Sequence, residues 1–126
     1  MAAYEIQKVV PRKRPKTVYG NTYNIDTGCG QLTVTINRDD EGIMEIFARL
    51  GKAGQCGMAQ NEALCRAVSI GLRSGIDPEV FIKHLSNIKC SQPTWFDGEQ
   101  VTSCADGIAK ALKKEMGDCS MKEINE

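Results

Sequence analysis

The chain has 126 residues, of which 16 are Lys or Arg, 16 are Asp or Glu, and 41% are hydrophobic. This length fits one domain with a single core, and the zero net charge excludes a strongly electrostatic binder of nucleic acid or anionic membrane. No apolar run is long enough to cross a bilayer, and residues 1–16 lack the apolar stretch of a signal peptide. We therefore expect a cytoplasmic protein.

Residues 1–16 are predicted to form an N-terminal strand or arm followed by a basic linker. Residues 4–10 suit a short strand. Prolines at positions 11 and 15 then bracket Arg12, Lys13 and Arg14 and interrupt regular structure. Clustered positive charge would suit contact with phosphate, but a solvated linker is the simpler interpretation in a neutral chain.

Residues 17–50 have the pattern of an antiparallel meander of three to four strands. Residues 17–26 are rich in β-forming types, and two later runs alternate apolar and polar residues, as strands with one buried face do. The apolar positions of these runs are Leu32, Val34 and Ile36, and then Met44, Ile46, Ala48 and Leu50. The turns at 27–30 and 38–42 are too short for crossovers between parallel strands.

After Gly51 the apolar period becomes helical, and three helices are expected. The first covers residues 58–74, and the second begins at Asp77-Pro78, an N-cap followed by a proline at the first helical position. A loop over residues 90–102 leads to the third helix, where Ser103 and Asp106 form a capping box. The order of elements predicts an α+β fold, with the helices packed on one face of the sheet.

Four of the six cysteines lie at the ends of predicted elements. In a cytoplasmic chain they indicate free thiols, metal ligands or redox chemistry rather than structural disulfides. Four thiolates at one point would suit zinc, although the sequence contains no C-x-x-C pair. The four are Cys29, Cys56, Cys90 and Cys104. Cys65 instead belongs to the apolar stripe of the first helix, and Cys119 lies in the polar tail.

Cys104 is the cysteine for which the sequence leaves the most possible roles open. At a helix N-terminus its thiolate form is favoured, so it could serve as a nucleophile, a metal ligand or a redox partner. It also shares an apolar face with Ile108 and Leu112, so it could be a small core residue. Since His84 is the only histidine, a cysteine–histidine hydrolase is excluded. No catalytic residue is predicted.

A second candidate site would bind nucleotide-like or phosphorylated ligands. Lys52 and Gly54 lie in a glycine-rich strand-to-helix connection, which is the general form of an anion site. The order of glycines matches neither a P-loop nor a dinucleotide fingerprint. Trp95 and Phe96 in the long loop, with Ser103 beside them, would add a stacking surface. The alternatives are a plain connection and two aromatic residues that cap the core.

The segment Thr-Ser-Cys-Ala-Asp at 102–106 resembles the signature of the TSCPD domain family. The stretches TYNIDTGCGQLTVTINRDDEG, FARLGKAGQCG, ALCRAVSIGLRSGIDPEVFIKHLSNIKC and TSCADGIAKAL follow in the family's order. Ala105 replaces the proline of the motif and leaves the cap and the cysteine intact. The resemblance implies a domain over residues 17–116, between the arm of residues 1–16 and a polar tail of residues 117–126.

Domains of this family typically occur at the C-terminus of adenosylcobalamin-dependent, class II ribonucleotide reductases and also as free-standing proteins. The reductase's barrel, radical-forming cysteine and cobalamin pocket do not fit in this chain. The resemblance therefore implies an accessory module that supports ribonucleotide reduction, and so DNA synthesis, in trans. Adenosylcobalamin would be bound only by a large partner reductase. A nucleotide-binding protein and a zinc-stabilised interaction domain are the alternatives, and the sequence leaves a homo-oligomer open.

The resemblance also joins Cys29, Cys56, Cys90 and Cys104 into one candidate set. If all four meet, zinc is expected, because zinc prefers four thiolate ligands in a closed site. If only two meet, a reversible disulfide is expected. If none meet, Cys104 is a core residue.

Overall fold

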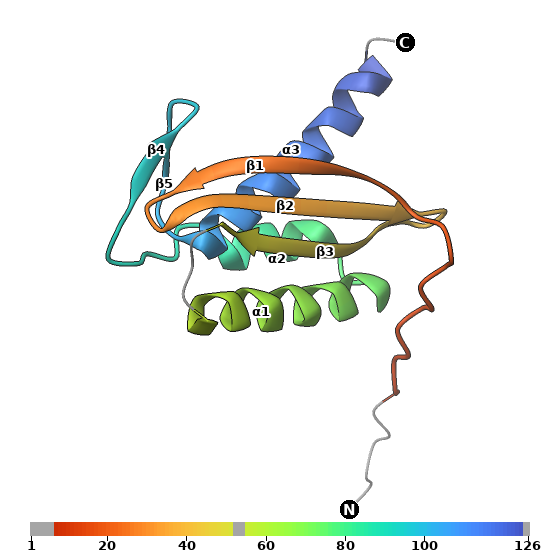
Figure 1. Cartoon of the computed structure of the whole chain (residues 1–126). Helices are drawn as coiled ribbons and strands as arrows, with labels where there is room; N and C mark the ends of the chain where they lie inside the picture. Colours follow the sequence, from red (N-terminus) through yellow and green to blue (C-terminus); the bar gives the residue numbers. More distant parts are fainter. Residues whose placement is uncertain (1–6, 52–54, 125–126) are drawn as a thin grey trace, which may run out of the picture.

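The computed structural model describes residues 7–51 and 55–124. It confirms an α+β fold in which an antiparallel sheet precedes the helices (Figure 1). The elements are β1 (Tyr19–Thr27), β2 (Gly30–Asp39), β3 (Gly42–Leu50), α1 (Gln55–Arg73), α2 (Pro78–Leu85), β4 (Thr94–Phe96), β5 (Glu99–Val101) and α3 (Cys104–Ile124). No helix in the described ranges is long and apolar enough to span a bilayer.

The three-stranded sheet has the order β1-β2-β3, with both pairs antiparallel. Thr27 pairs with Gly30 and Asp39 with Gly42, so each turn has two residues between the paired positions. Gly30 and Gly42 have φ angles of 131° and 125°, which glycine adopts without steric cost. The predicted alternation holds, since Leu32, Val34 and Ile36 are all buried.

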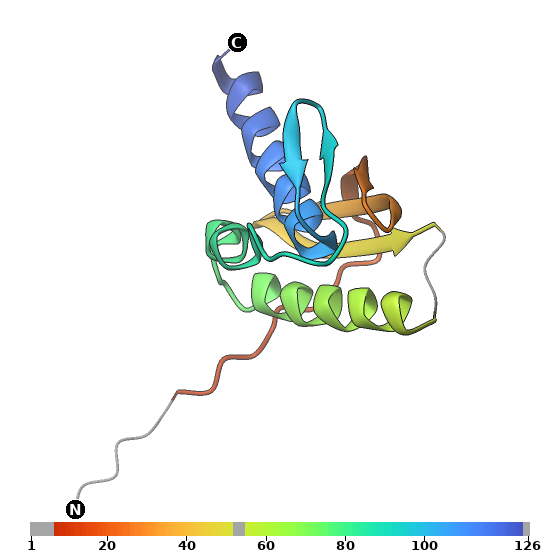
Figure 2. The same ribbon diagram turned by 90° about the vertical axis from the view of Figure 1, so that its left-hand side faces the viewer.

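The core lies between one face of the sheet and the helices. In Figures 1 and 2, α2 and α3 lie behind the sheet and α1 runs beside β3, while the opposite face carries no helix. Asp77 caps α2 as predicted, because its side chain accepts a hydrogen bond from Glu79 N. The buried cluster consists mainly of Ile25, Leu32, Val34, Ile36, Ile46, Leu50, Cys65, Val68, Leu72, Val101, Ile108, Ala111 and Leu112.

Helix α1 closes the outer edge of β3 with two side chains. Ser69 Oγ accepts a hydrogen bond from Ile46 N at 3.0 Å and donates one to Ile46 O at 3.2 Å. Cys65 Sγ accepts a hydrogen bond from Ala48 N–H, while burial raises the pKa of this thiol to about 11. Cys65 is therefore a neutral core residue, as the sequence predicted, and these backbone groups of the edge strand are satisfied.

A buried carboxylate fixes α3 to the sheet. Glu115 is 1% exposed and accepts hydrogen bonds from Tyr23 Oη, from Asn21 Nδ2 at 2.9 Å and from Arg38 Nε at 2.9 Å. Burial raises the pKa of Glu115, but these three donors outweigh burial and hold the pKa below its ordinary value. Glu115 is thus a charged anchor of the fold.

Two segments differ from the sequence prediction. The expected loop over residues 90–102 contains the hairpin β4–β5, in which Asp97 and Gly98 turn with φ angles of 52° and 76°. The Asp-Gly pair is a recognised signal for such a turn. Helix α3 continues to Ile124, beyond the end expected near residue 116.

The interpretation of the basic segment as a solvated linker is wrong for Arg12 and Arg14. Arg12 Nε lies 2.7 Å from Asp39 Oδ2, and Arg12 also donates to Leu72 O. The hydrogen bond from Arg12 holds the pKa of Asp39 below its usual range. Arg14 Nε contacts both carboxylate oxygens of Glu45 at 3.0 Å. The arm is therefore held against the sheet by charge pairs between segments far apart in the sequence.

We predict that Arg12→Ala lowers the free energy of unfolding by about 1–2 kcal/mol, because it removes charge-assisted hydrogen bonds to a largely buried Asp39. Lys13→Ala removes an exposed neighbouring charge and serves as the matched control. Thermal unfolding should show a melting temperature several degrees lower for Arg12→Ala alone. Equal melting temperatures for the two variants would contradict a docked arm.

Candidate functional site

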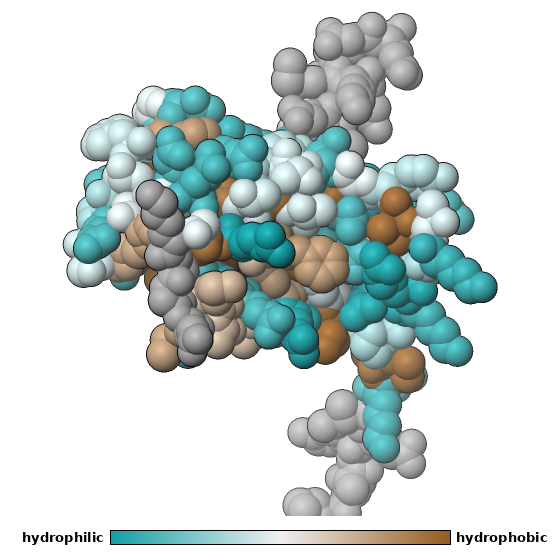
Figure 3. Space-filling view, viewed as in Figure 1, coloured by the Kyte–Doolittle hydropathy of each residue, from teal (hydrophilic) through white to brown (hydrophobic). Residues whose placement is uncertain are grey.

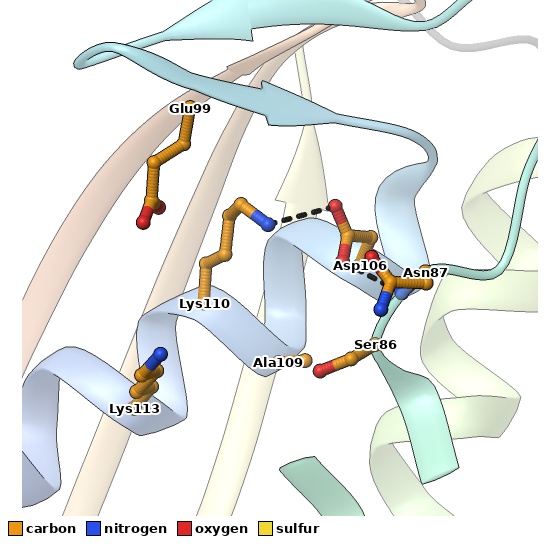
Figure 4. Close-up of a pocket in the computed structure, with 7 residues that line it drawn as sticks. All are labelled: Ser86, Asn87, Glu99, Asp106, Ala109, Lys110 and Lys113. Atoms are coloured by element: carbon orange, nitrogen blue, oxygen red, sulfur yellow. Dashed lines mark hydrogen bonds and ion pairs between the residues drawn. The ribbon is translucent and has the colours of Figure 1, made fainter. Parts of the chain in front are cut away.

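The segment 102–106 forms a hydrogen-bonded turn at the start of α3. Ser103 Oγ accepts a hydrogen bond from Asp106 N at 3.1 Å, so the predicted cap is present. The Asp106 carboxylate does not return to Ser103, but accepts from Thr102 N at 3.0 Å and from Asn87 N at 2.9 Å. Lys110 Nζ is the third donor and lies 3.0 Å from Asp106 Oδ2 (Figure 4).

Asp106 is completely buried yet ionised. Burial raises its pKa, but the donors at Asn87, Thr102 and Lys110 outweigh burial and lower the pKa below its ordinary value. The ionised carboxylate therefore joins the segment after α2 to the start of α3. Hydrogen bonds within the folded chain replace the water that the carboxylate loses on burial.

Thr102 strengthens the same connection. Its carbonyl oxygen accepts a hydrogen bond from Cys90 N at 2.9 Å, and its hydroxyl donates to Ile88 O at 2.8 Å. Residues 88–90 are thereby held against the turn that carries Cys104. Two cysteines that are distant in the sequence are brought to one place by backbone bonds, independently of their thiols.

The β1–β2 turn brings a third cysteine to this region. Thr27 Oγ1 accepts a hydrogen bond from Cys29 N at 3.2 Å and donates to Gly30 O at 2.7 Å, which fixes the turn. A Cβ atom at Gly28 would lie 1.6 Å from Gln92 O, so only glycine allows the turn to approach the loop after Cys90 this closely.

The thiols of Cys29, Cys90 and Cys104 form a cluster, which we call the thiol cluster. Cys29 is exposed overall, and the pKa of its thiol is raised by partial burial and by the nearby thiols of Cys104 and Cys90. Cys90 Sγ also accepts a hydrogen bond from Gln92 N at 3.4 Å.

Cys56, the fourth predicted ligand, stays outside these contacts. It is exposed in the first turn of α1, which begins at the same end of the domain as α3 and the β1–β2 turn (Figures 1 and 2). Within residues 7–51 and 55–124, no three His, Cys, Asp or Glu side chains are placed closely enough to hold a metal ion.

Three of the five predicted ligand-binding residues are described by the structure, and their surroundings differ. Lys52 and Gly54 lie outside the described residues. Trp95 is 69% exposed on the β4–β5 hairpin, whereas Phe96 is half-buried, with Lys114 Nζ 5.2 Å from its ring centre. Ser103 is buried, and its hydroxyl is used in the helix cap.

A small pocket beside the Asp106 turn was not predicted. Its volume is about 170 Å³, and the side chains of Lys110 and Lys113 face it from α3 (Figure 4). Its full lining is Ser86, Asn87, Glu99, Asp106, Ala109, Lys110 and Lys113. The residues come from three separate segments, so no local pattern in the sequence indicates the pocket.

Comparisons with known proteins identify relatives of this chain. A family model described as the TSCPD domain matches residues 3–116. The chain is 32% identical over 94 residues to a vitamin B12-dependent ribonucleotide reductase of Streptantibioticus cattleyicolor, covering 70% of this chain and 16% of that protein. It is 28% identical over 111 residues to the vitamin B12-dependent ribonucleotide reductase of Streptomyces clavuligerus, covering 85% of this chain and 11% of that protein. No solved structure matches the chain significantly.

We predict that Asp106→Asn lowers the free energy of unfolding at pH 7 by about 2–3 kcal/mol, because the amide cannot accept from every present donor. The folded-state pKa of Asp106 is lowered, so its contribution is present above the unfolded pKa and is lost as the pH falls through the folded pKa. The difference from the native chain should therefore shrink below about pH 4.

Urea unfolding at several pH values measures this difference. Asp97→Asn is the matched control, because Asp97 is 68% exposed and pairs only with an exposed Lys114. A loss for Asp106→Asn that is the same at every pH, or no larger than for Asp97→Asn, would contradict a buried ionised anchor.

Proposed function

Because this chain belongs to the TSCPD domain family, we propose that it is an accessory module of ribonucleotide reduction that acts in trans on a large B12-dependent reductase. The main support is the family match over residues 3–116. The chain spans only 8–16% of the length of the B12-dependent ribonucleotide reductases that it resembles. What is shared is therefore one module of those proteins, and it makes up nearly all of this chain.

Within this proposal, zinc would draw the thiols of Cys29, Cys90 and Cys104 together, with Cys56 as the fourth ligand, because these side chains are not placed closely enough to hold a metal ion in the present arrangement. Backbone hydrogen bonds bring Cys90 beside the turn that carries Cys104, and the Gly28 turn brings Cys29 to the loop after Cys90. Zinc accepts thiolates, prefers four ligands and would stabilise their charge. When bound, it would supply geometry rather than redox chemistry. Cys29, Cys90 and Cys104 would then cross-link the β1–β2 turn, the loop after α2 and the start of α3.

The proximity of the Cys29 thiol to those of Cys104 and Cys90 also favours a second candidate, a reversible disulfide. Cys29 could pair with Cys90 or Cys104, since both are its neighbours. Oxidation of two thiols to a disulfide would release two electrons and two protons, which reduce a disulfide of the partner reductase to two thiols. The third cysteine of the cluster would remain a free thiol.

We predict that protein purified without chelator contains about one zinc per chain and that Cys104→Ser loses it, because a four-ligand site fails without one ligand. Cys65→Ala is the matched control, since Cys65 lies in the core outside the cluster. Elemental analysis and thiol titration, before and after denaturation, measure both. Metal-free protein whose clustered thiols titrate freely would exclude zinc, and one disulfide formed by mild oxidation would then favour the redox candidate.

The accessory role is tested with the reductase of Streptomyces clavuligerus, shortened by the segment that aligns with this chain. We predict that the shortened reductase loses most of its ribonucleotide reduction and that adding this chain restores at least part of it. The Cys104→Ser variant should restore at least about tenfold less, whereas Trp95→Ala, with its exposed side chain, should restore as much as the native chain. Full activity of the shortened enzyme, or no effect of the folded native chain, would refute the role in trans.

A further inference from the structure

The uncovered face of the sheet carries a groove that the proposed function does not use. The groove has a volume of about 1160 Å³ and lies between β3 and α1. Phe47 and Arg49 of β3 form its floor, and Arg66, Ile70 and Arg73 of α1 form its wall. Figure 3 shows this face of the molecule, on which hydrophobic residues extend from near the centre towards the lower left and lie beside hydrophilic ones.

Three half-exposed apolar side chains follow the length of the groove. Phe47, Met58 and Ile70 are 52%, 49% and 50% exposed. Met58 and Ile70 are twelve residues apart on α1, which corresponds to about 18 Å along the helix. Phe47 lies between them, because its neighbours Ile46 and Ala48 bond to Ser69 and Cys65 of α1. The apolar contacts are thus spread along an elongated surface.

The groove carries uncompensated positive charge. Of its four arginines, Arg14 pairs with Glu45 at 3.0 Å, and Arg66 lies 3.5 Å from Glu62. Arg49 and Arg73 have no carboxylate partner among the described residues. The Nε atom of Arg73 is moreover buried without a hydrogen-bond partner, so the described chain does not fully satisfy this guanidinium.

We infer that this groove binds an extended acidic segment of a partner protein. Its carboxylates would pair with Arg49 and Arg73, and its apolar side chains would pack on Phe47 and Ile70. A groove of about 18 Å accommodates five to six residues of extended chain. The two unpaired arginines come from different elements, and Phe47 is the only aromatic side chain among the described residues of the lining. A nucleotide would need several cations close together for its phosphates and an aromatic ring beside them for its base. The separated arginines therefore favour a peptide over a nucleotide.

The binding mode follows from the closed edge of β3. Because Ser69 and Cys65 bond to the outward backbone groups of Ile46 and Ala48, the partner cannot add a strand there. Recognition would therefore rest on side chains. The inference is independent of the thiol cluster, since Cys29, Cys90 and Cys104 do not line the groove.

A direct test uses a fluorescein-labelled twelve-residue peptide with four glutamates and four leucines, and a matched peptide with glutamines in place of the glutamates. We predict saturable binding of the acidic peptide by fluorescence anisotropy, at least tenfold tighter than the glutamine peptide and weakened by salt. Arg49→Gln and Phe47→Ser should each weaken binding severalfold. Lys89→Gln and Trp95→Ala, which change exposed residues outside the groove, are the matched controls.

Three outcomes would overturn the inference. The first is no saturable binding of the acidic peptide to folded native chain. The second is equal binding of the two peptides, or native affinity in both Arg49→Gln and Phe47→Ser. The third is displacement of the peptide by ATP together with ATP binding that Phe47→Ser abolishes, which would make the groove a nucleotide site.

Discussion

The buried carboxylate of Asp106 is the interaction on which the arrangement of the thiol cluster depends. A buried carboxylate is stable in its charged form only when hydrogen-bond donors match its lone pairs. The Asp106 carboxylate accepts hydrogen bonds from Thr102 N, Asn87 N and Lys110 Nζ. Two of these donors are backbone groups from separate segments. The loop that carries Cys90 and the helix that begins at Cys104 therefore have one fixed relation, whatever occupies the thiols.

Glu115 repeats this principle at a second point of α3. The two carboxylates are nine residues apart, or about 13 Å along the helix, and they bind different parts of the fold. Asp106 holds the segment after α2, whereas Glu115 holds Asn21, Tyr23 and Arg38 of the sheet. These two groups of hydrogen bonds oppose sliding and rotation of α3, so they fix the start of the helix, where Cys104 lies, relative to the sheet.

The sequence predicted the elements that local physics determines. The alternation around Leu32 and the cap at Asp77 needed no knowledge of distant residues. The docking of Arg12 could not be predicted, because its partner Asp39 is 27 residues away and charge alone does not select a partner. The cysteine set could be predicted only in part, since the approach of Cys29 to Cys90 and Cys104 depends on Thr102, Asp106 and Gly28 rather than on cysteine spacing.

The closed edge of β3 depends on a near match between the rise of four residues along a helix and the rise of two residues along a strand. Four residues of helix rise about 6.0 Å and two residues of strand about 6.7 Å, so Cys65 and Ser69 meet Ala48 and Ile46 in step. The mismatch of about 0.7 Å accumulates with each further pair of helix side chain and strand backbone group. This limits how many such hydrogen bonds can follow one another along the edge. A strand sealed in this way cannot recruit a neighbouring strand. Fusion to a much longer chain would then leave the pairing at the β3 edge unchanged, even with foreign strands held at high local concentration.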